Sequence, residues 1–303
     1  MKPKREKRPI SGVLLLDKPL GVTSNGALQH AKRLFRAAKA GHTGILDPLA
    51  SGLLPICFGE ATKFSQFLTD ADKAYVATAR LGEVTNTGDA EGEVIARQPV
   101  HVTLPQVTDA MQQFVGEIEQ IPPMYSALKH QGRPLYDYAR KGIDIPRPPR
   151  PVTIHALTLK QFAGETLEFS VDCSKGTYIR VLAEDIGRAL GCGAHLIALR
   201  RTRSGGFSLD QAITLEALEA MDAAARDACL LPTDCLVAQL PKILLDADSS
   251  FYLRQGQGIW LPKLEATAIY RVYDSNQQLI GVCGVDVQGR LQPRRLLATA
   301  PEK

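Results

Sequence analysis

The sequence predicts an α+β protein with a large domain at residues 11–240 and a small β domain at 241–303. Up to about residue 240, apolar runs typical of strands alternate with segments of helical periodicity. Beyond it, short apolar runs broken by glycine and polar residues follow, which is typical of a small β domain or barrel. A chain of 303 residues is also longer than most single domains, which favours two domains.

In the large domain, strands are expected where short runs are rich in aliphatic and β-branched residues, and residues 85–96 are expected to form a turn between strands. These runs are residues 12–19, 74–82, 152–162, 166–174 and 195–203. Helices are expected where apolar residues recur at every third or fourth position. These segments are residues 23–41, which stops at Gly41, 61–68, 104–116, which ends at Gly116, 178–190 and 214–228.

The strands of the small domain are expected at the apolar runs that follow the boundary near residue 240. These runs are residues 242–247, 258–262, 268–274 and 278–286.

The composition is that of an ordinary globular protein, with 45% hydrophobic and 22% charged residues. No run approaches the roughly 18 apolar residues of a membrane helix, so we expect a soluble protein with no signal peptide and no membrane contact. The six cysteines form no C-x-x-C pair, which indicates reduced thiols and a cytoplasmic location. Cys192 and His195 have the nearest ligand spacing, but two ligands do not make a metal site, so we expect no metal.

Residues 1–10 form a basic N-terminal arm, because five of the first eight residues are Lys or Arg and only Glu6 opposes them. Such an arm is either a solvated tail or a segment that contacts nucleic acid. The composition of the arm leaves both interpretations open.

Residues 122–151 form a second basic region, with six Lys or Arg against two Asp, three tyrosines and seven of the nineteen prolines. The prolines prevent long regular elements and favour an extended insertion with one short helix near residues 134–141. Basic side chains among aromatic ones suit a phosphate backbone and unstacked bases. A proline-stiffened loop with a solvated charged face explains the composition equally well.

The stretch GHTGILDPLASGLLPICFGEATK, residues 41–63, places one carboxylate, Asp47, in an otherwise apolar segment. Pro48 biases Asp47 away from helical geometry, so a loop is expected to present the carboxylate. An Asp before Pro is most often a turn former or cap, yet a charge among buried groups needs a partner or a chemical role. Common phosphate-binding loops do not fit, because the sequence has no G-x-x-x-x-G-K and GCGAHL lacks the third glycine of a dinucleotide fingerprint.

This stretch resembles the central motif of the bacterial tRNA pseudouridine synthases of the TruB type. Three further stretches resemble the family in the same order: GVLLLDKPLGVTSN, KAYVATARLGEVTNTGDAEG and CSKGTYIRVLAEDIGRALGCGAHLIALRRT. The match covers residues 11–204, and residues 122–151 resemble the family's mobile thumb insertion, so we call them the thumb. The chain beyond residue 240 fits the family's C-terminal domain only in its length and in its pattern of short apolar runs.

The resemblance implies a mixed, largely antiparallel central sheet with flanking helices and a thumb, followed by a small PUA-like β domain. It implies that the enzyme converts uridine 55 in the T loop of tRNA to pseudouridine, without cofactor or metal. The T-arm of tRNA would be the partner, and the resemblance implies no obligatory protein partner. Two alternatives remain: a tRNA-binding and folding protein without catalysis, and a glycosidase, which would normally need two placed carboxylates.

The resemblance also assigns catalytic residues. Asp47 matches the essential carboxylate, which could attack the sugar, attack the base or remove a ribose proton. Arg180 matches the partner that keeps this carboxylate charged, although an i,i+4 surface pair with Glu184 is the simpler interpretation. Tyr75 matches the tyrosine that stacks on the target base, and its hydroxyl is a candidate for handling the C5 proton; taken alone, it is more simply a core residue.

Further residues match positions that contact the RNA. His42 matches the histidine that holds the T loop open, whereas Tyr178 and Leu199 match residues of the uracil pocket. Lys18 is interpreted as structural or phosphate-facing. The remaining assignments are phosphate contacts: Lys129, Arg133 and Arg140 in the thumb, and Arg200, Arg201 and Arg203 as clamps on the RNA backbone.

Overall fold

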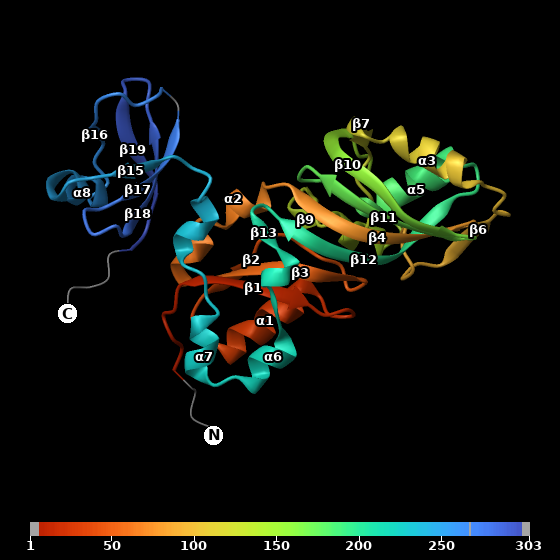
Figure 1. Ribbon diagram of the computed structural model, residues 1–303, viewed down its shortest axis with the longest axis horizontal. Helices are drawn as coiled ribbons and strands as arrows, with labels where there is room; N and C mark the ends of the chain where they lie inside the picture. Colours follow the sequence, from red (N-terminus) through yellow and green to blue (C-terminus); the bar gives the residue numbers. More distant parts are fainter. Residues whose placement is uncertain (1–5, 267, 299–303) are drawn as a thin grey trace.

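The computed structural model describes residues 6–266 and 268–298, which form two main sheets of ten and five strands (Figure 1). In the ten-stranded sheet the order is β14-β1-β3-β12-β4-β11-β10-β7, with β2 paired to β3 and β13 paired to β12. Its strands are β1 (Gly12–Lys18), β2 (Ala40–His42), β3 (Ala50–Phe58), β4 (Lys73–Leu81), β7 (Gly116–Gln120), β10 (Arg150–Ala163), β11 (Thr166–Cys173), β12 (Ala194–Ser204), β13 (Phe207–Ser208) and β14 (Ile213–Thr214).

Within this sheet, the described β12–β3 and β1–β14 pairs are parallel, and the other described pairs are antiparallel. Side chains of β4 alternate between buried and more exposed positions, as expected for a strand with one face against the core. The predicted α+β class with a mixed, largely antiparallel central sheet is therefore confirmed.

Helices cover both faces of parts of this sheet (Figure 1). Side chains of α1, α3, α5 and α6 share one apolar core with the strands, and η1, α2 and η3 pack with the opposite face of β1 and β3 in a second core. The helices of this part of the chain, outside the thumb, are α1 (Ser24–Leu34), η1 (Gly59–Lys63), α2 (Ser65–Thr69), α3 (Leu104–Gln112), α5 (Ile179–Ala189), η2 (Leu209–Gln211), α6 (Leu215–Ala220), α7 (Ala223–Ala228) and η3 (Thr233–Val237).

The predicted stop of the first helix at Gly41 is wrong. The side chain of Thr23 caps the start of α1 by accepting a hydrogen bond from the Gly26 N–H at 3.0 Å. The helix ends at Leu34, and Arg36 then adopts a left-handed φ of 53°, which turns the chain. Gly41 lies in β2, so the residues before the Asp47 loop are a strand paired with β3.

The segment 214–228, predicted as one helix, forms two. Met221 is extended, and the side chain of Asp222 starts α7 by accepting a hydrogen bond from the Ala225 N–H at 2.8 Å. An Asp inside an apolar periodic segment can start a new helix instead of continuing the first. The predicted end of the 104–116 helix is also wrong, because α3 ends at Gln112 and Gly116 starts β7.

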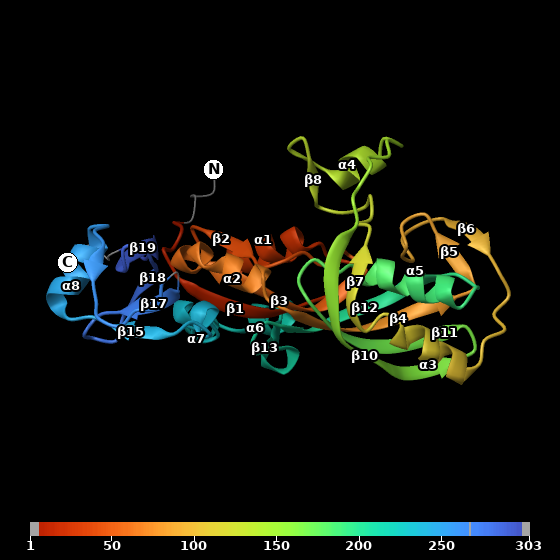
Figure 2. The ribbon, with the colours of Figure 1, turned by 90° about the horizontal axis from the view of Figure 1, so that it is seen from above.

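The thumb joins β7 to β10 and projects from the sheet (Figure 2). It contains the short strands β8 (Lys129–His130) and β9 (Arg133–Pro134) and the helix α4 (Leu135–Ala139). The short helix predicted near residues 134–141 is thus confirmed. The predicted turn at residues 85–96 is only partly right: residues 86–93 connect β5 (Glu83–Thr85) to β6 (Val94–Arg97), and residues 94–96 are part of β6.

The second sheet has the order β15-β17-β18-β19-β16 and its own apolar core around Leu253, Ile280 and Cys283. Its elements are β15 (Lys242–Leu244), α8 (Ala247–Arg254), β16 (Ile259–Trp260), β17 (Ile269–Tyr273), β18 (Leu279–Val285) and β19 (Arg290–Leu296). The sequence predicted the small β unit but neither α8 nor β19.

Of the basic N-terminal arm, residues 1–5 lie outside the described residues. Arg8 forms an ion pair with Asp227, and its backbone hydrogen-bonds to Arg36 and Ala38. Residue 8 is therefore bound to the large domain and is not part of a solvated tail. None of the described helices is long and apolar enough to span a membrane.

Candidate active site

Asp47 lies on the loop between β2 and β3, which hydrogen bonds hold on both sides of the carboxylate. The Leu46 N–H donates to Ser24 Oγ at 2.7 Å, and that hydroxyl donates to the Leu46 carbonyl at 2.9 Å. On the other side, the Pro48 carbonyl accepts from the Gly21 N–H at 2.8 Å. The loop therefore fixes the backbone at Asp47 while its side chain stays 44% exposed.

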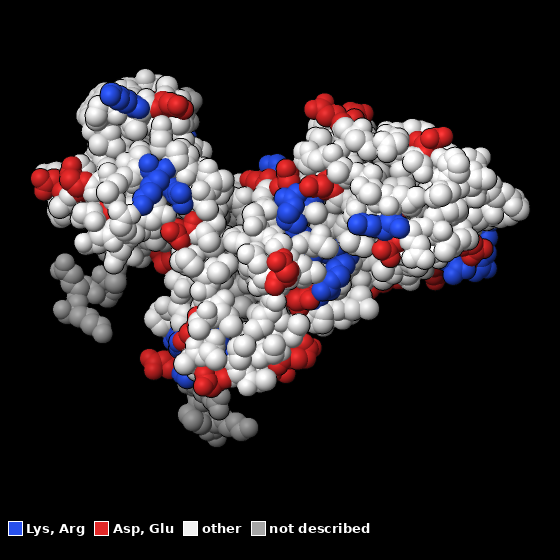
Figure 3. Space-filling view, viewed as in Figure 1, with Lys and Arg blue, Asp and Glu red and all other residues white. Residues whose placement is uncertain are grey.

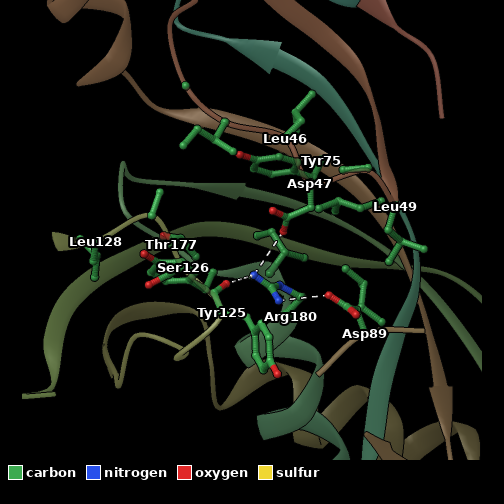
Figure 4. Close-up of a pocket in the computed structure, with 18 of the residues that line it drawn as sticks. Leu46, Asp47, Leu49, Tyr75, Asp89, Tyr125, Ser126, Leu128, Thr177 and Arg180 are labelled. Carbon is green, nitrogen blue, oxygen red and sulfur yellow. Dashed lines mark hydrogen bonds and ion pairs between the residues drawn. The ribbon is translucent and has the colours of Figure 1, made fainter. Parts of the chain in front are cut away.

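A cavity of about 490 Å³ opens in front of Asp47 (Figure 4). This volume lies in the range of small-ligand pockets, roughly 300–1,000 Å³. The Asp47 loop forms one wall, the start of α5 forms another, and thumb residues 125–128 close a third. The predicted site residues His42, Asp47, Tyr75, Tyr178, Arg180 and Leu199 all line the cavity.

Arg180 is the charged partner of Asp47. Its Nη2 lies 3.2 Å from Asp47 Oδ2, and the side chain is 9% exposed. Nη2 also donates to the Tyr125 carbonyl at 2.7 Å, and Nη1 donates to the Thr87 carbonyl at 3.1 Å. Glu184, the partner in the simpler interpretation, is not among the described ion-pair partners of Arg180.

Asp89 is a second carboxylate on Arg180 that sequence reasoning missed. Its Oδ2 lies 3.1 Å from Arg180 Nη1, and its side chain is 4% exposed. Oδ1 accepts hydrogen bonds from the Thr87 hydroxyl at 2.7 Å and the Glu91 N–H at 3.1 Å. The turn between β5 and β6 thus holds the guanidinium through a second carboxylate, and Figure 4 shows this contact beside the one to Asp47. The only sequence signal was a TGD turn inside a motif that resembles the family.

Three family models match successive parts of the chain. They describe the N-terminal domain of the TruB family of pseudouridylate synthases (residues 32–179), the C-terminal domain of tRNA pseudouridylate synthase B (180–238) and the C-terminal region of pseudouridine synthase II TruB (241–297). The curated tRNA pseudouridine synthase B of Methylobacillus flagellatus is 57% identical over 299 residues, which cover 99% of both chains. This chain belongs to the TruB family.

Other relatives agree with this membership. The tRNA pseudouridine synthase B of Thiobacillus denitrificans is also 57% identical, again over 99% of both chains. Among solved structures, a chain from the crystal structure of a Cbf5-Nop10-Gar1 complex is 27% identical, with a TM-score of 0.70. That match covers 94% of this chain and 85% of the other.

In this TruB family member, Tyr75 and Leu199 come from neighbouring strands. Tyr75 on β4 is 8% exposed, and burial raises the pKa of its phenol, which keeps the hydroxyl protonated. Leu199 on β12 lies opposite Ala50 of β3 and Ala77 of β4. Two small neighbours leave space above the sheet, and the apolar walls of the cavity lie there.

His42 ends β2, immediately before the Asp47 loop. Burial, and secondly the positive charge of Arg201, lower the pKa of its imidazole. The ring is therefore neutral at neutral pH, and its buried Nδ1 has no hydrogen-bond partner among the described residues. A neutral ring suits contact with an unstacked base better than contact with a phosphate.

Tyr178 is held by the buried amide of Gln120 at the end of β7. The Tyr178 N–H donates to Gln120 Oε1 at 2.9 Å, and Gln120 Nε2 donates to the Tyr178 carbonyl at 3.3 Å. This pair connects the strand that enters the thumb to the start of α5. Sequence reasoning missed Gln120, because a Gln at the end of a strand carries no signal by itself.

Lys18 is completely buried, so its phosphate-facing interpretation is wrong in this structure. Its Nζ donates to the carbonyls of Pro19 at 2.9 Å and Val22 at 2.6 Å, and thereby supports the chain between β1 and α1. Burial lowers the pKa of this lysine to about 8.

Of the three arginines of β12, Arg201 is not a clamp on the RNA backbone, and the other two are ion-paired. Arg200 forms an ion pair with Asp17 at 2.6 Å, and Arg203 forms one with Asp172. Arg201 is 1% exposed and cannot reach an RNA backbone. The RRTR sequence suggested a basic patch, whereas alternation along the strand buries the middle arginine.

The thumb keeps its predicted cations at the surface. Lys129, Arg133 and Arg140 are all exposed, and the Arg140 guanidinium lies 5.4 Å from the Tyr136 ring centroid. In contrast, the face in Figure 3 shows basic and acidic side chains interspersed, with no extended positive patch. Among the described residues, no three His, Cys, Asp or Glu side chains group as metal ligands.

Proposed function

We propose that this protein isomerises uridine 55 in the T loop of tRNA to pseudouridine, with Asp47 as the essential carboxylate. As a TruB family member it converts uridine to pseudouridine in tRNA; the position and the residue roles are our proposal. The observation that carries it is the carboxylate of Asp47, 44% exposed in a cavity and paired to a buried arginine. A mere binder of a polyanion gains nothing from such a carboxylate.

The volume of the cavity suits one nucleoside, so the target uridine would have to leave the base stack of the T loop. Its apolar walls, Tyr75 and Leu199, would hold the uracil ring on its faces. Tyr178 and the backbone around it would contact the polar edge of the uracil. His42 would occupy the space that the base leaves in the loop.

The reaction breaks the N1–C1′ bond, turns the uracil and joins C5 to C1′. C5 then loses its proton, and N1 gains one, so the nucleotide keeps its composition. Asp47 can serve by attacking the sugar, by attacking the base or by removing a ribose proton, and each of these roles needs the ionised form. The Arg180 charge favours this form, and its planar fork fixes the orientation of the carboxylate.

The two carboxylates on Arg180 have different environments. Asp47 is open to the cavity, whereas Asp89 is 4% exposed and satisfied by protein donors. A glycosidase would normally present two carboxylates to its substrate, whereas of the two that line this cavity only Asp47 is substantially exposed. The alternative of tRNA binding without catalysis is disfavoured because it leaves this charge arrangement without a role. We place the activity in the cytoplasm, where reduced cysteines are the rule.

The test is pseudouridine formation in a T-arm RNA by the wild-type chain and by Asp47→Asn. We expect product with the wild type, none with Asp47→Asn, and equal RNA affinity, because the phosphate contacts lie in the thumb. Asp172→Asn is the matched control, since Asp172 pairs with an arginine outside the cavity. Turnover by Asp47→Asn would remove Asp47 from its role, and no product with the wild type would refute the proposed substrate.

A further inference from the structure

A buried guanidinium lies beside the cavity, and so far only its effect on His42 has been described. Arg201 on β12 is 1% exposed, and its Nε donates to the Leu53 carbonyl at 2.6 Å. Its Nη2 is buried and has no hydrogen-bond partner among the described residues. An unsatisfied buried donor costs stability, about 1–3 kcal/mol, so packing alone does not explain this side chain.

The strand register places Arg201 directly opposite Tyr75 in the antiparallel β12–β4 pair. Residues opposite each other point to the same face, with Cβ atoms about 4.5–5.5 Å apart. Arg201 Nη1 also lies 3.5 Å from where a Cβ on Gly44 would stand, and Gly44 lines the cavity on the Asp47 loop. The guanidinium is therefore between the Tyr75 strand and the loop that carries Asp47.

We propose that Arg201 is a positioning residue for Tyr75: with substrate bound, its N–H donors hold the tyrosine hydroxyl oxygen, and its charge stabilises that oxygen against negative charge. This inference rests on the proposed function, in which the Tyr75 hydroxyl is the group that handles the C5 proton. A phenol oxygen that accepts from Arg201 turns its own hydrogen toward the cavity. The same fixed positive charge favours any build-up of negative charge on that oxygen.

The electrostatics of the neighbouring groups agree with this geometry. Burial raises the pKa of Tyr75, and the Arg201 charge is the largest influence that acts in the opposite direction. Arg201 also lowers the pKa of His42 and of Lys73, after the effect of burial. A carboxylate paired with Arg201 would weaken its effect on the pKa of Tyr75, His42 and Lys73. Arg201 Nη2 has no such partner among the described residues, so the positive charge remains available to the tyrosine.

The first test is a double-mutant cycle with Arg201→Met and Tyr75→Phe, because Phe keeps the ring and removes the hydroxyl. The readouts are single-turnover pseudouridine formation on a T-arm RNA, RNA affinity and the thermal melting temperature. With Tyr75 present, Arg201→Met should lower the rate about 10- to 100-fold at unchanged affinity, and Arg201→Lys should restore part of it. In the Tyr75→Phe background, the same change should cost less than about twofold.

Equal losses in both backgrounds would overturn the proposal, and a wild-type rate for Arg201→Met would do the same. A parallel fall in melting temperature and in both rates would assign Arg201 a structural role. These outcomes are read relative to a wild-type chain that makes pseudouridine. If the wild type makes none, the proposed function fails separately.

The second test needs neither turnover nor RNA. Difluorotyrosine placed at position 75 has a more acidic phenol, so its ionisation can be followed in the free protein. The other titratable groups that influence the phenol are the Cys173 thiol on β11 and the Asp47 carboxylate. Arg201→Met should move the titration to higher pH by about 1–3 units, because the favourable positive charge is lost. An unchanged titration, with Arg201→Lys as the charge-keeping control, would overturn the proposal.

Discussion

The cavity and the thumb both carry cationic side chains, but the protein holds them in opposite ways. Around the cavity, Arg180 and Arg201 are buried, and protein carbonyls and carboxylates fix them. In the thumb, Lys129, Arg133 and Arg140 are exposed. A buried charge with fixed partners can orient a reacting group, whereas an exposed charge contributes mainly to long-range, salt-dependent affinity. Substitutions around the cavity should therefore lower the reaction rate, and substitutions in the thumb should weaken RNA binding.

The largest effect should come from Arg180→Met. Without the guanidinium, the carboxylates of Asp47 and Asp89 face each other with no cation between them, and Asp47 loses its orientation. We expect the single-turnover rate to fall by at least about 10³-fold, since a preorganised charge is lost. The free energy of unfolding should also fall, by about 3–5 kcal/mol, because a buried pair is broken.

Arg180→Lys is the finer variant, because it keeps the charge but cannot reach four acceptors at once. We expect it to be folded and clearly slower than wild type. Arg188→Met is the matched control on the same helix, since Arg188 is 76% exposed. Wild-type rates for both Arg180 variants would contradict the claim that the buried cations of the cavity control the reaction rate.

Asp89→Asn should have the next largest effect. The amide keeps the shape of the side chain but weakens its hold on Arg180, so the orientation of Asp47 becomes less defined. We expect a loss of about 10- to 100-fold in single-turnover rate, from a coupling of ordinary size between neighbouring groups. RNA affinity should not change. Asp185→Asn, which changes an ion pair with Arg188 outside this cavity, should leave the rate unaffected. A larger loss of affinity than of rate would indicate that Asp89 supports the RNA-binding surface instead.

The sequence predicted these two regions unequally well. The loop of Asp47 and the helix of Arg180 were found because they lie in long motifs that resemble the family, whereas residue type alone favoured a turn former and a surface ion pair. Asp89 and Gln120 were missed because their importance comes from partners 91 and 58 residues away, which no local pattern records. The apolar run that forms β3 was not assigned as a strand. It contains Pro55, which a strand inside a sheet usually lacks, yet Pro55 pairs with Leu15 of β1.

For the β12 arginines, a local pattern was visible in the sequence but was misleading. Their sequence looked like a phosphate-binding patch, but the structure buries Arg201 and pairs Arg200 and Arg203 with acidic neighbours. A basic run in a strand divides between two faces of the sheet, so only part of it can face an RNA. Composition predicted the thumb better, because in a proline-rich insertion with few regular elements most charged side chains stay at the surface.

The thumb should give an effect on binding alone. Changing Lys129, Arg133 and Arg140 to Ala should weaken T-arm binding and make it less sensitive to salt. Each lost phosphate contact should reduce the slope of log affinity against log salt by about 0.7–0.9. The single-turnover rate at saturating RNA should stay at the wild-type value. Three exposed cations outside the thumb, Arg97, Lys160 and Arg188, form the matched control set. An unchanged salt slope in the thumb variant would mean that its charges are only solvated.

The smallest effect on catalysis and binding should be the one at Lys18, which tests whether a buried cation can act without touching RNA. Burial lowers its pKa from 10.5 to about 8, so between these values the folded chain binds fewer protons than the unfolded chain. The charged lysine therefore destabilises the fold fully below about pH 8, and this cost disappears as the pH rises toward 10.5. The unfolding free energy of wild type, relative to Lys18→Met, should rise across this window by at most about 1.4 kcal/mol per pH unit.

Lys73→Met should show the same trend, because burial also lowers the pKa of Lys73 to about 8. Denaturant unfolding at several pH values from 7 to 10.5 measures the difference for both variants. The salt slope for T-arm binding then separates the two interpretations of Lys18. A lysine that supports the β1–α1 connection through two carbonyls leaves that slope unchanged when it is replaced. A lower slope in Lys18→Met, with no pH-dependent difference in stability, would mean that the side chain leaves its buried position and binds a phosphate in the complex.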